Sequence, residues 1–122
     1  MARILVVEDN ATNMKLAVML LESVGHTVIT ARDAESALTL AREAQPALIL
    51  MDIQLPGMDG LEATALLKAD EATRAIPVIA LTALAMKGDE ERIRAAGCDG
   101  YIAKPMAYQE FLTTIAAQLD GA

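Results

Sequence analysis

The sequence predicts an α/β domain of the (βα)5 type, a doubly wound parallel sheet covered by helices on both faces. Two observations support this prediction. Short apolar runs alternate along the chain with longer segments of helical period. The runs are also apolar throughout, as strands buried on both faces require. Because right-handed crossovers leave few ways to wind such a sheet, we expect the strand order 2-1-3-4-5.

The length of the chain fits one domain. Its 122 residues, 54% of them hydrophobic, suffice for a single core, and no Ser-rich or Gly-rich linker divides them. We therefore expect one domain over residues 1–122. The predicted strands are Arg3–Val7, Thr27–Thr30, Leu48–Met51, Val78–Leu81 and Gly100–Ala103.

Capping and breaking residues bound the predicted helices. Asp33 and Asp59 have the position of N-caps, and Glu62 gives Asp59 the spacing of a capping box. Gly25 and Pro46 end the first two helical segments. The predicted helices run over Thr12–Val24, from the cap Asp33 to Ala44, from the cap Asp59 to Lys68, over Leu84–Ala96 and over Ala107–Leu119.

The charge of the chain argues against nucleic acid as a partner. The net charge is -7 and the isoelectric point is near 4.5, so no basic stripe is available to neutralise phosphates. No window approaches the run of about 18 apolar residues that crosses a membrane, and the amino terminus shows no secretion signal. We expect a soluble, cytoplasmic protein whose partners are proteins, with no role for nucleic acid or membrane.

Polar side chains stand at the carboxyl ends of four predicted strands. Glu8 and Asp9 follow the first strand and Asp52 follows the third, which is its neighbour in the expected order. Thr82 and Lys104 follow the fourth and fifth strands. Open α/β sheets bind ligands at this edge, and crowded carboxylates usually need a divalent cation to remain ionised together. The pattern predicts one pocket that combines three acids, a hydroxyl and a cation.

Each of these residues also has an ordinary interpretation. Glu8 and Asp9 fit a solvated strand end, Thr82 fits a helix cap, and Lys104 fits a surface lysine. Among other classes of the same fold, a mononucleotide or flavin binder would place a Gly/Ser/Thr-rich loop after the first strand, where this chain has two acids. A phosphohydrolase with an aspartate nucleophile would need a larger cap or a second domain.

Four motifs in order resemble the receiver domains of two-component response regulators, which have a CheY-like, flavodoxin-like fold. They are VVEDN, LILMDIQLPGMDG, IALTALA and YIAKP, and together they span essentially the whole chain. The run TALAMKGDEERIRAAGCDGYIAKP is similar to stand-alone receivers of the DivK type, which act in cell-cycle and division signalling. Receivers of hybrid histidine kinases carry similar runs, so a fragment of such a kinase remains an alternative, as does a phosphate-independent adaptor.

The resemblance implies a phosphoacceptor rather than an enzyme with a separate substrate. It implies that Asp52 accepts a phosphoryl group from a phosphohistidine on a sensor histidine kinase or histidine phosphotransferase. A receiver also assists its own phosphorylation and dephosphorylation, and it passes the signal to a downstream regulatory protein. By the same resemblance, Asp9, Asp52 and the carbonyl of Gln54 hold Mg²⁺, and Glu8 acts mostly through metal-bound water.

The family pattern also implies a switch. Thr82 is the hydroxyl that reaches the phosphoryl group, Lys104 is its cationic partner, and Tyr101 turns inward when the threonine moves. The bond between Lys104 and Pro105 is expected to be cis. Apolar side chains on the last two helices, the last strand and the first helix are expected to form partner surfaces, although such side chains are more often core; they are Leu84, Met86, Tyr101, Pro105, Tyr108 and Phe111, with Met14 and Ala17 facing a kinase helix.

Overall fold

Strands and helices alternate along the whole chain. The computed structural model describes residues 2–83, 87–104 and 107–120. Within these ranges five strands are each followed by a helix. In chain order they are β1 Arg3–Val7, α1 Ala11–Ser23, β2 Thr27–Ala31, α2 Ala34–Ala44, β3 Leu48–Asp52, α3 Gly60–Ala69, β4 Val78–Thr82, α4 Lys87–Ala95, β5 Gly100–Ala103 and α5 Tyr108–Asp120.

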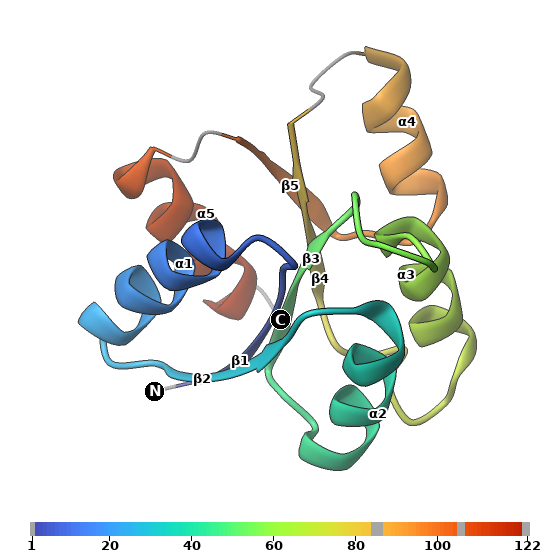
Figure 1. Cartoon of the computed structure of the whole chain (residues 1–122), viewed down its shortest axis with the longest axis horizontal. Coiled ribbons are helices and arrows are strands. Elements are labelled where there is room, and N and C mark those ends of the chain that lie inside the picture. Colours follow the sequence, from blue (N-terminus) through green and yellow to red (C-terminus); the bar gives the residue numbers. More distant parts are fainter. Residues whose placement is uncertain (1, 84–86, 105–106, 121–122) are drawn as a thin grey trace.

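The strands form one parallel sheet in the order β2-β1-β3-β4-β5. Helices α1 and α5 lie on one side of it and α2, α3 and α4 on the other (Figure 1). This is the predicted (βα)5 architecture with the predicted strand order. Every strand therefore ends at the same edge of the sheet, next to the amino ends of the helices that follow.

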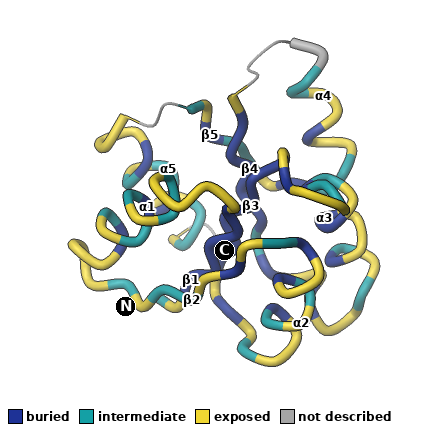
Figure 2. Tube along the Cα trace, in the orientation of Figure 1, coloured by how far each residue is buried: buried dark blue, intermediate teal, exposed yellow. Residues whose placement is uncertain are grey.

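Alternate side chains of each central strand pack into two different cores. In β1, Leu5 and Val7 belong to the core under α2, α3 and α4, whereas Ile4 and Val6 belong to the core under α1 and α5. The central strands β1, β3 and β4 are the most buried part of the molecule and are dark blue in Figure 2, whereas the edge strands β2 and β5 are only partly buried. A continuous apolar run satisfies both cores, because successive side chains point to opposite faces.

The predicted caps form. The side chain of Asp33 accepts a hydrogen bond from Ser36 N, 2.7 Å away, and that of Asp59 accepts one from Glu62 N at 2.8 Å. An unpredicted cap, Asn10, accepts a bond from Asn13 N at 2.9 Å and starts α1. These caps satisfy backbone donors at helix starts. They also fix the chain where it leaves the carboxyl edge of the sheet.

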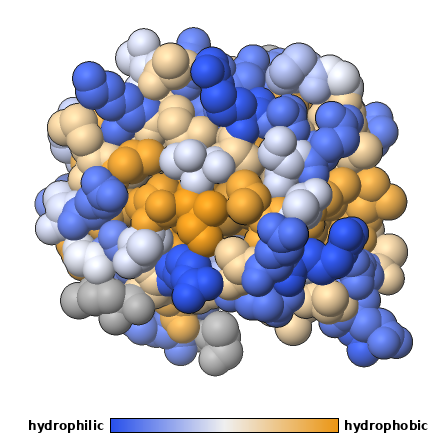
Figure 3. Space-filling model, turned by 60° about the horizontal axis from the view of Figure 1, so that its bottom comes forward, coloured by the Kyte–Doolittle hydropathy of each residue, from blue (hydrophilic) through white to orange (hydrophobic). Residues whose placement is uncertain are grey.

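The surface combines charged and apolar areas. Figure 3 shows an apolar patch in the middle of one face, bordered by hydrophilic side chains. In the described part of the chain, the large apolar side chains with most exposure are Met19, Val24, Leu66 and Tyr108. None of the helices described is both long and apolar enough to cross a membrane.

Candidate functional site

Neighbouring strands bring the predicted polar residues to one place. Val7 of β1 pairs with Met51 of β3, so Glu8 and Asp52, the next residues, lie beside each other. Asp52 pairs with Leu81 of β4, one residue before Thr82. The backbone N–H of Lys104 donates to Thr82 O at 2.8 Å, which extends the pairing of β4 and β5. The carboxyl edge thus gathers the acids, the hydroxyl and the cation.

The three carboxylates converge as a possible metal-ligand set. Glu8, Asp9 and Asp52 each offer one oxygen, and these oxygens lie within 4.8 Å of one another. Glu8 and Asp52 are buried, whereas Asp9 is exposed. Among the described residues, Glu8 Oε2 is a buried oxygen without a hydrogen-bond partner. Hard oxygen ligands and an unpartnered buried oxygen fit a small divalent cation such as Mg²⁺.

Lys104 bridges two of the acids. Its Nζ lies 2.8 Å from Glu8 Oε1 and 3.2 Å from Asp52 Oδ2. The lysine side chain is 17% exposed, the Glu8 side chain 1% and the Asp52 side chain 6%. Little water therefore screens the three charges, and the ammonium offsets part of the repulsion between the two carboxylates.

The pKa shifts follow from this crowding. Burial raises the pKa of Glu8 to about 7, and the neighbouring Asp52 carboxylate adds to the rise, while Lys104 opposes it. For Lys104, burial alone would lower the pKa, but the hydrogen bond to Glu8 and the charge of Asp52 raise it above its ordinary value. Lys104 is therefore positively charged at neutral pH and provides a fixed positive charge in the site. Its attraction for Glu8 is outweighed by burial and by the neighbouring aspartate.

Both oxygens of Asp52 have a protein partner. Oδ2 accepts from Lys104, and Oδ1 accepts from the backbone N–H of Gln54 at 2.9 Å. Gln54 is thus tied to Asp52 through its backbone, and its carbonyl as a metal ligand stays a prediction. Thr82 is buried at the end of β4. Its role as a switch hydroxyl also stays a prediction.

A glycine at the start of α3 allows the helix to approach the site closely. A Cβ on Gly60 would lie 2.1 Å from Asp52 O and 2.7 Å from Ile53 Cα. The N–H of Gly60 donates to Ile53 O at 3.2 Å. The backbone of α3 therefore packs directly on the end of β3, and a side chain at Gly60 would separate them.

One contact at this edge was not predicted from the sequence. Arg32 follows β2, and its guanidinium donates to the carbonyl oxygen of Asp9 at 3.2 Å. The polar residues predicted for the site follow the first, third, fourth and fifth strands. Applied to the second strand, the same rule would have identified Arg32.

The prediction that Phe111 and Ala17 form partner surfaces is wrong. Phe111 and Ala17 are 0% and 1% exposed and belong to the core between the sheet, α1 and α5. Helix α1 is apolar on more than one face, so its sequence does not show which residues are covered, whereas Phe111 lies on the single apolar stripe of α5. Tyr108 is 60% exposed. Met14 is half-buried against the same core as Phe111.

Tyr101 packs against the opposite core and is half-buried, so it has side-chain surface on both the core and solvent sides. Its movement stays a prediction. Three expected positions, Leu84, Met86 and Pro105, lie outside the described residues, and so does the expected cis bond at Pro105.

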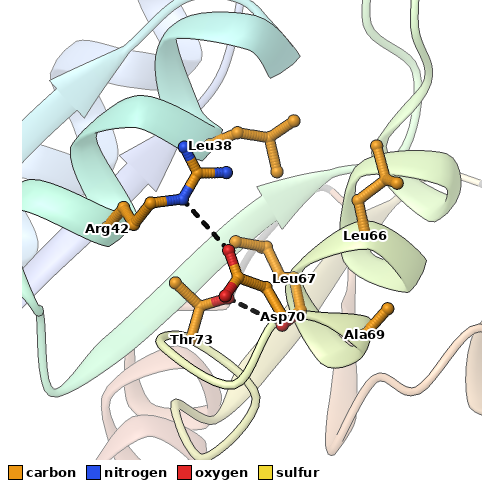
Figure 4. Close-up of a pocket in the computed structure, with 7 residues that line it drawn as sticks. All are labelled: Leu38, Arg42, Leu66, Leu67, Ala69, Asp70 and Thr73. Atoms are coloured by element: carbon orange, nitrogen blue, oxygen red, sulfur yellow. Dashed lines mark hydrogen bonds and ion pairs between the residues drawn. The ribbon is translucent and has the colours of Figure 1, made fainter.

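The surface also has a hollow between α2 and α3 (Figure 4). Leu38 and Leu66 line it, and Arg42 Nε pairs with Asp70 Oδ2 across it at 3.0 Å. Arg42 and Asp70 lie at the carboxyl ends of their helices, hence at the edge of the sheet opposite the three acids. The hollow is separate from the site.

Known proteins with similar sequences are two-component signalling proteins. The chain is 56% identical over 119 residues to the polar-differentiation response regulator DivK of Brucella ovis, covering 98% of this chain and 97% of that protein. It is 55% identical, with the same coverage, to the protein of that name from Brucella anthropi.

Similar solved structures include receiver and chemotaxis domains. The receiver domain of the sensor histidine kinase PA1611 from Pseudomonas aeruginosa matches with a TM-score of 0.89 and 39% identity, covering 99% of this chain and 98% of that one; it has a magnesium ion coordinated in its active site cleft. The chemotaxis response regulator CheY4 of Vibrio cholerae matches with a TM-score of 0.92 and 26% identity, covering 97% of this chain and 98% of that one. The family model of the response regulator receiver domain matches residues 4–116. With its sheet order, its edge of acids and these matches, the chain belongs to the response regulator receiver domain family.

Proposed function

We propose that Asp52 is the phosphoacceptor of this receiver domain, and that residues 1–122 act as one unit around it. The observation that carries the proposal is the bridge from Lys104 to Glu8 and Asp52 at the carboxyl edge, 2.8 and 3.2 Å long. It places a buried carboxylate beside a fixed positive charge. Phosphoryl transfer needs such positioning and charge stabilisation more than it needs covalent machinery.

In the proposed reaction a carboxylate oxygen of Asp52 attacks the phosphorus of a phosphohistidine. The new O–P bond forms as the N–P bond breaks, and the electron pair of that bond returns to the imidazole nitrogen. Lys104 stabilises negative charge on the phosphoryl oxygens. The Gln54 N–H orients Asp52 through its contact at 2.9 Å. Thr82 provides the hydroxyl that binds the phosphorylated form.

We propose Asp9 and Asp52 as ligands of Mg²⁺, with the Gln54 carbonyl as a third and Glu8 acting through bound water. Support comes from the convergence of the carboxylate oxygens within 4.8 Å and from the unpartnered Glu8 Oε2. When bound, Mg²⁺ supplies positive charge that neutralises both the acids and the transferring group. The same groups would serve loss of the phosphoryl group to water, so that the domain assists both directions of its own switch.

We further propose a DivK-like role in polar differentiation and division signalling. The 56% identity to the Brucella proteins over nearly the whole chain supports it. The phosphodonor is then a sensor histidine kinase or histidine phosphotransferase, and the output is a protein contact with a downstream regulator. Exposed Tyr108 is a candidate for that contact, because its ring offers apolar surface at the start of α5.

The test is intact-mass analysis after incubation with acetyl phosphate. Wild type with Mg²⁺ should gain the mass of one phosphoryl group, and chelation should abolish the gain. The Asp52→Asn variant should not gain it, because the nucleophilic carboxylate is absent. A gain on Asp52→Asn equal to wild type would refute the assignment of Asp52. If wild type reacted with neither acetyl phosphate nor a phosphorylated histidine phosphotransferase, a phosphate-independent adaptor would be favoured instead.

A further inference from the structure

The loop that carries Glu8 and Asp9 is held at two adjacent positions, by the last residue of β2 and by the residue that follows it. The Glu8 N–H donates to Ala31 O at 3.0 Å, which continues the pairing of β1 and β2 by one residue. The residues that follow Glu8 and Ala31 in the chain make the second contact, in which the Arg32 guanidinium donates to Asp9 O at 3.2 Å. On the far side of the loop, Asn10 caps α1. Asp9 therefore lies between two fixed neighbours, and Arg32 holds its carbonyl.

We propose that Arg32 is a positioning residue for Mg²⁺ binding: it holds the backbone of Asp9 so that the carboxylate faces the other two acids. This inference rests on the proposed role of Asp9 as a metal ligand. The contact is made to the carbonyl, and among the described residues the Arg32 side chain forms no ion pair with a carboxylate. The ligand oxygens of Asp9 thus stay available to the metal while the loop is held in place.

The positive charge of Arg32 and its contact with Asp9 should have opposite effects on the affinity for Mg²⁺. A guanidinium near a cation site repels the cation, whereas a fixed ligand backbone lowers the cost of arranging the ligands. Loss of Arg32 should therefore tighten Mg²⁺ binding if charge dominates and weaken it if positioning dominates. The sign of the change decides between the two.

Arg3 provides a matched control. Its guanidinium also donates to a backbone carbonyl of a neighbouring segment, Ala44 O at 2.6 Å, but at the opposite edge of the sheet. Arg3→Ala removes the same charge and the same kind of contact as Arg32→Ala. An effect on stability alone should appear in both variants, and an effect on the site should appear only in Arg32→Ala.

The experiment is calorimetric titration of Mg²⁺ into wild type, Arg32→Ala, Arg32→Lys and Arg3→Ala, at low and high salt. Arg32→Ala should raise the dissociation constant about tenfold, the lower end of the contribution of residues that orient metal ligands. Arg32→Lys keeps an N–H donor that can reach the Asp9 carbonyl, but without the planar fork of the guanidinium, so its dissociation constant should lie between those of wild type and Arg32→Ala. High salt screens the effect of the charge, so the weaker Mg²⁺ binding of Arg32→Ala relative to wild type should persist at high salt. Arg3→Ala should bind like wild type.

Two results would overturn the inference while leaving the proposed function intact: tighter binding by Arg32→Ala, or equal constants in wild type and all Arg32 variants. Other results would overturn both the inference about Arg32 and the proposed role of Asp9 as a metal ligand. If wild type bound no Mg²⁺, or if Asp9→Asn bound it as well as wild type, then Asp9 would not be a ligand and Arg32 would have nothing to position.

Discussion

Lys104 shows how one residue can hold a set of acids together before any metal arrives. Its Nζ reaches both Glu8 and Asp52, and its own pKa lies above the ordinary value because of these two acids. A partly buried cation among carboxylates offsets their repulsion, and its removal would leave the buried carboxylates without a compensating charge. The residue types at the site were predictable, since polar residues interrupt apolar strands there. Their distances were not, because the sequence does not say which oxygen meets which nitrogen.

The half-buried acid Asp70 should contribute to the loss of stability of the protein at low pH. A backbone hydrogen bond from Ala72 and then the side chain of Arg42 lower the pKa of Asp70. Its stabilisation is therefore present above the unfolded value of about 3.9 and is lost as the pH falls through the lower folded value. We expect Asp70→Asn to destabilise the protein at pH 7, and the difference from wild type to shrink below about pH 4.

Urea unfolding from pH 3 to 7 checks this prediction. Glu43→Gln, a change of the same charge at an exposed position of α2, is the control. A difference between wild type and Asp70→Asn that stays constant over the whole pH range would contradict it.

At the scale of elements, the sequence predicted where every strand starts and both bounds of β1 and β5. Three strands extend one residue beyond the prediction, to Ala31, Asp52 and Thr82. At Asp52 and Thr82 the predicted strand stops where the side chain becomes polar, whereas the backbone pairing continues regardless of the side chain. That reason does not apply to Ala31, which is apolar and buried. The sequence of α1 could not identify its covered face, because apolar residues extend beyond one stripe, and Ala17 was misplaced for this reason. Phe111 lies on the single apolar stripe of α5 with Leu112 and Ile115, so its spacing already favoured a core position.

The approach of α3 to β3 should be the element contact most sensitive to a single methyl group. Gly60→Ala would place a Cβ against the backbone of Asp52, so α3 or the chain end of β3 has to move. The atoms that the Cβ would meet belong to the backbone and not to a flexible side chain. We therefore expect a loss of about 3 kcal/mol in unfolding free energy. We also expect slower phosphorylation by acetyl phosphate.

Gly57→Ala is the comparison for this variant. Gly57 has φ of 73°, and no atom lies within 4 Å of the point that a Cβ would occupy, so an alanine there meets backbone strain without a clash. The cost should be about 1 kcal/mol. Denaturant unfolding of both variants measures the difference, and equal losses would show that close packing at Gly60 is not the cause.

At the scale of the whole molecule, Mg²⁺ binding should appear as resistance to unfolding. A ligand that binds only the folded state stabilises it by about 1.4 kcal/mol when its free concentration is ten times the dissociation constant. We expect this gain for wild type. Asp52→Asn should gain much less, because one of the three converging carboxylates is lost.

Thermal unfolding with Mg²⁺, with chelator, and with sodium chloride of matched ionic strength measures the effect. The matched salt separates specific binding from general screening of the net charge of -7. An equal gain for Asp52→Asn and wild type would place the binding site elsewhere.

The contact between Glu8 and Lys104 joins residues 96 positions apart in the chain. During synthesis, Glu8, Asp9 and Asp52 leave the ribosome long before the strand that carries the lysine. Until β5 pairs with β4, the three acids have no Lys104 ammonium to offset their repulsion. The proposed acceptor site is thus completed by the last strand added to the sheet, and we expect a nascent or truncated chain that lacks this strand and Lys104 not to be phosphorylated.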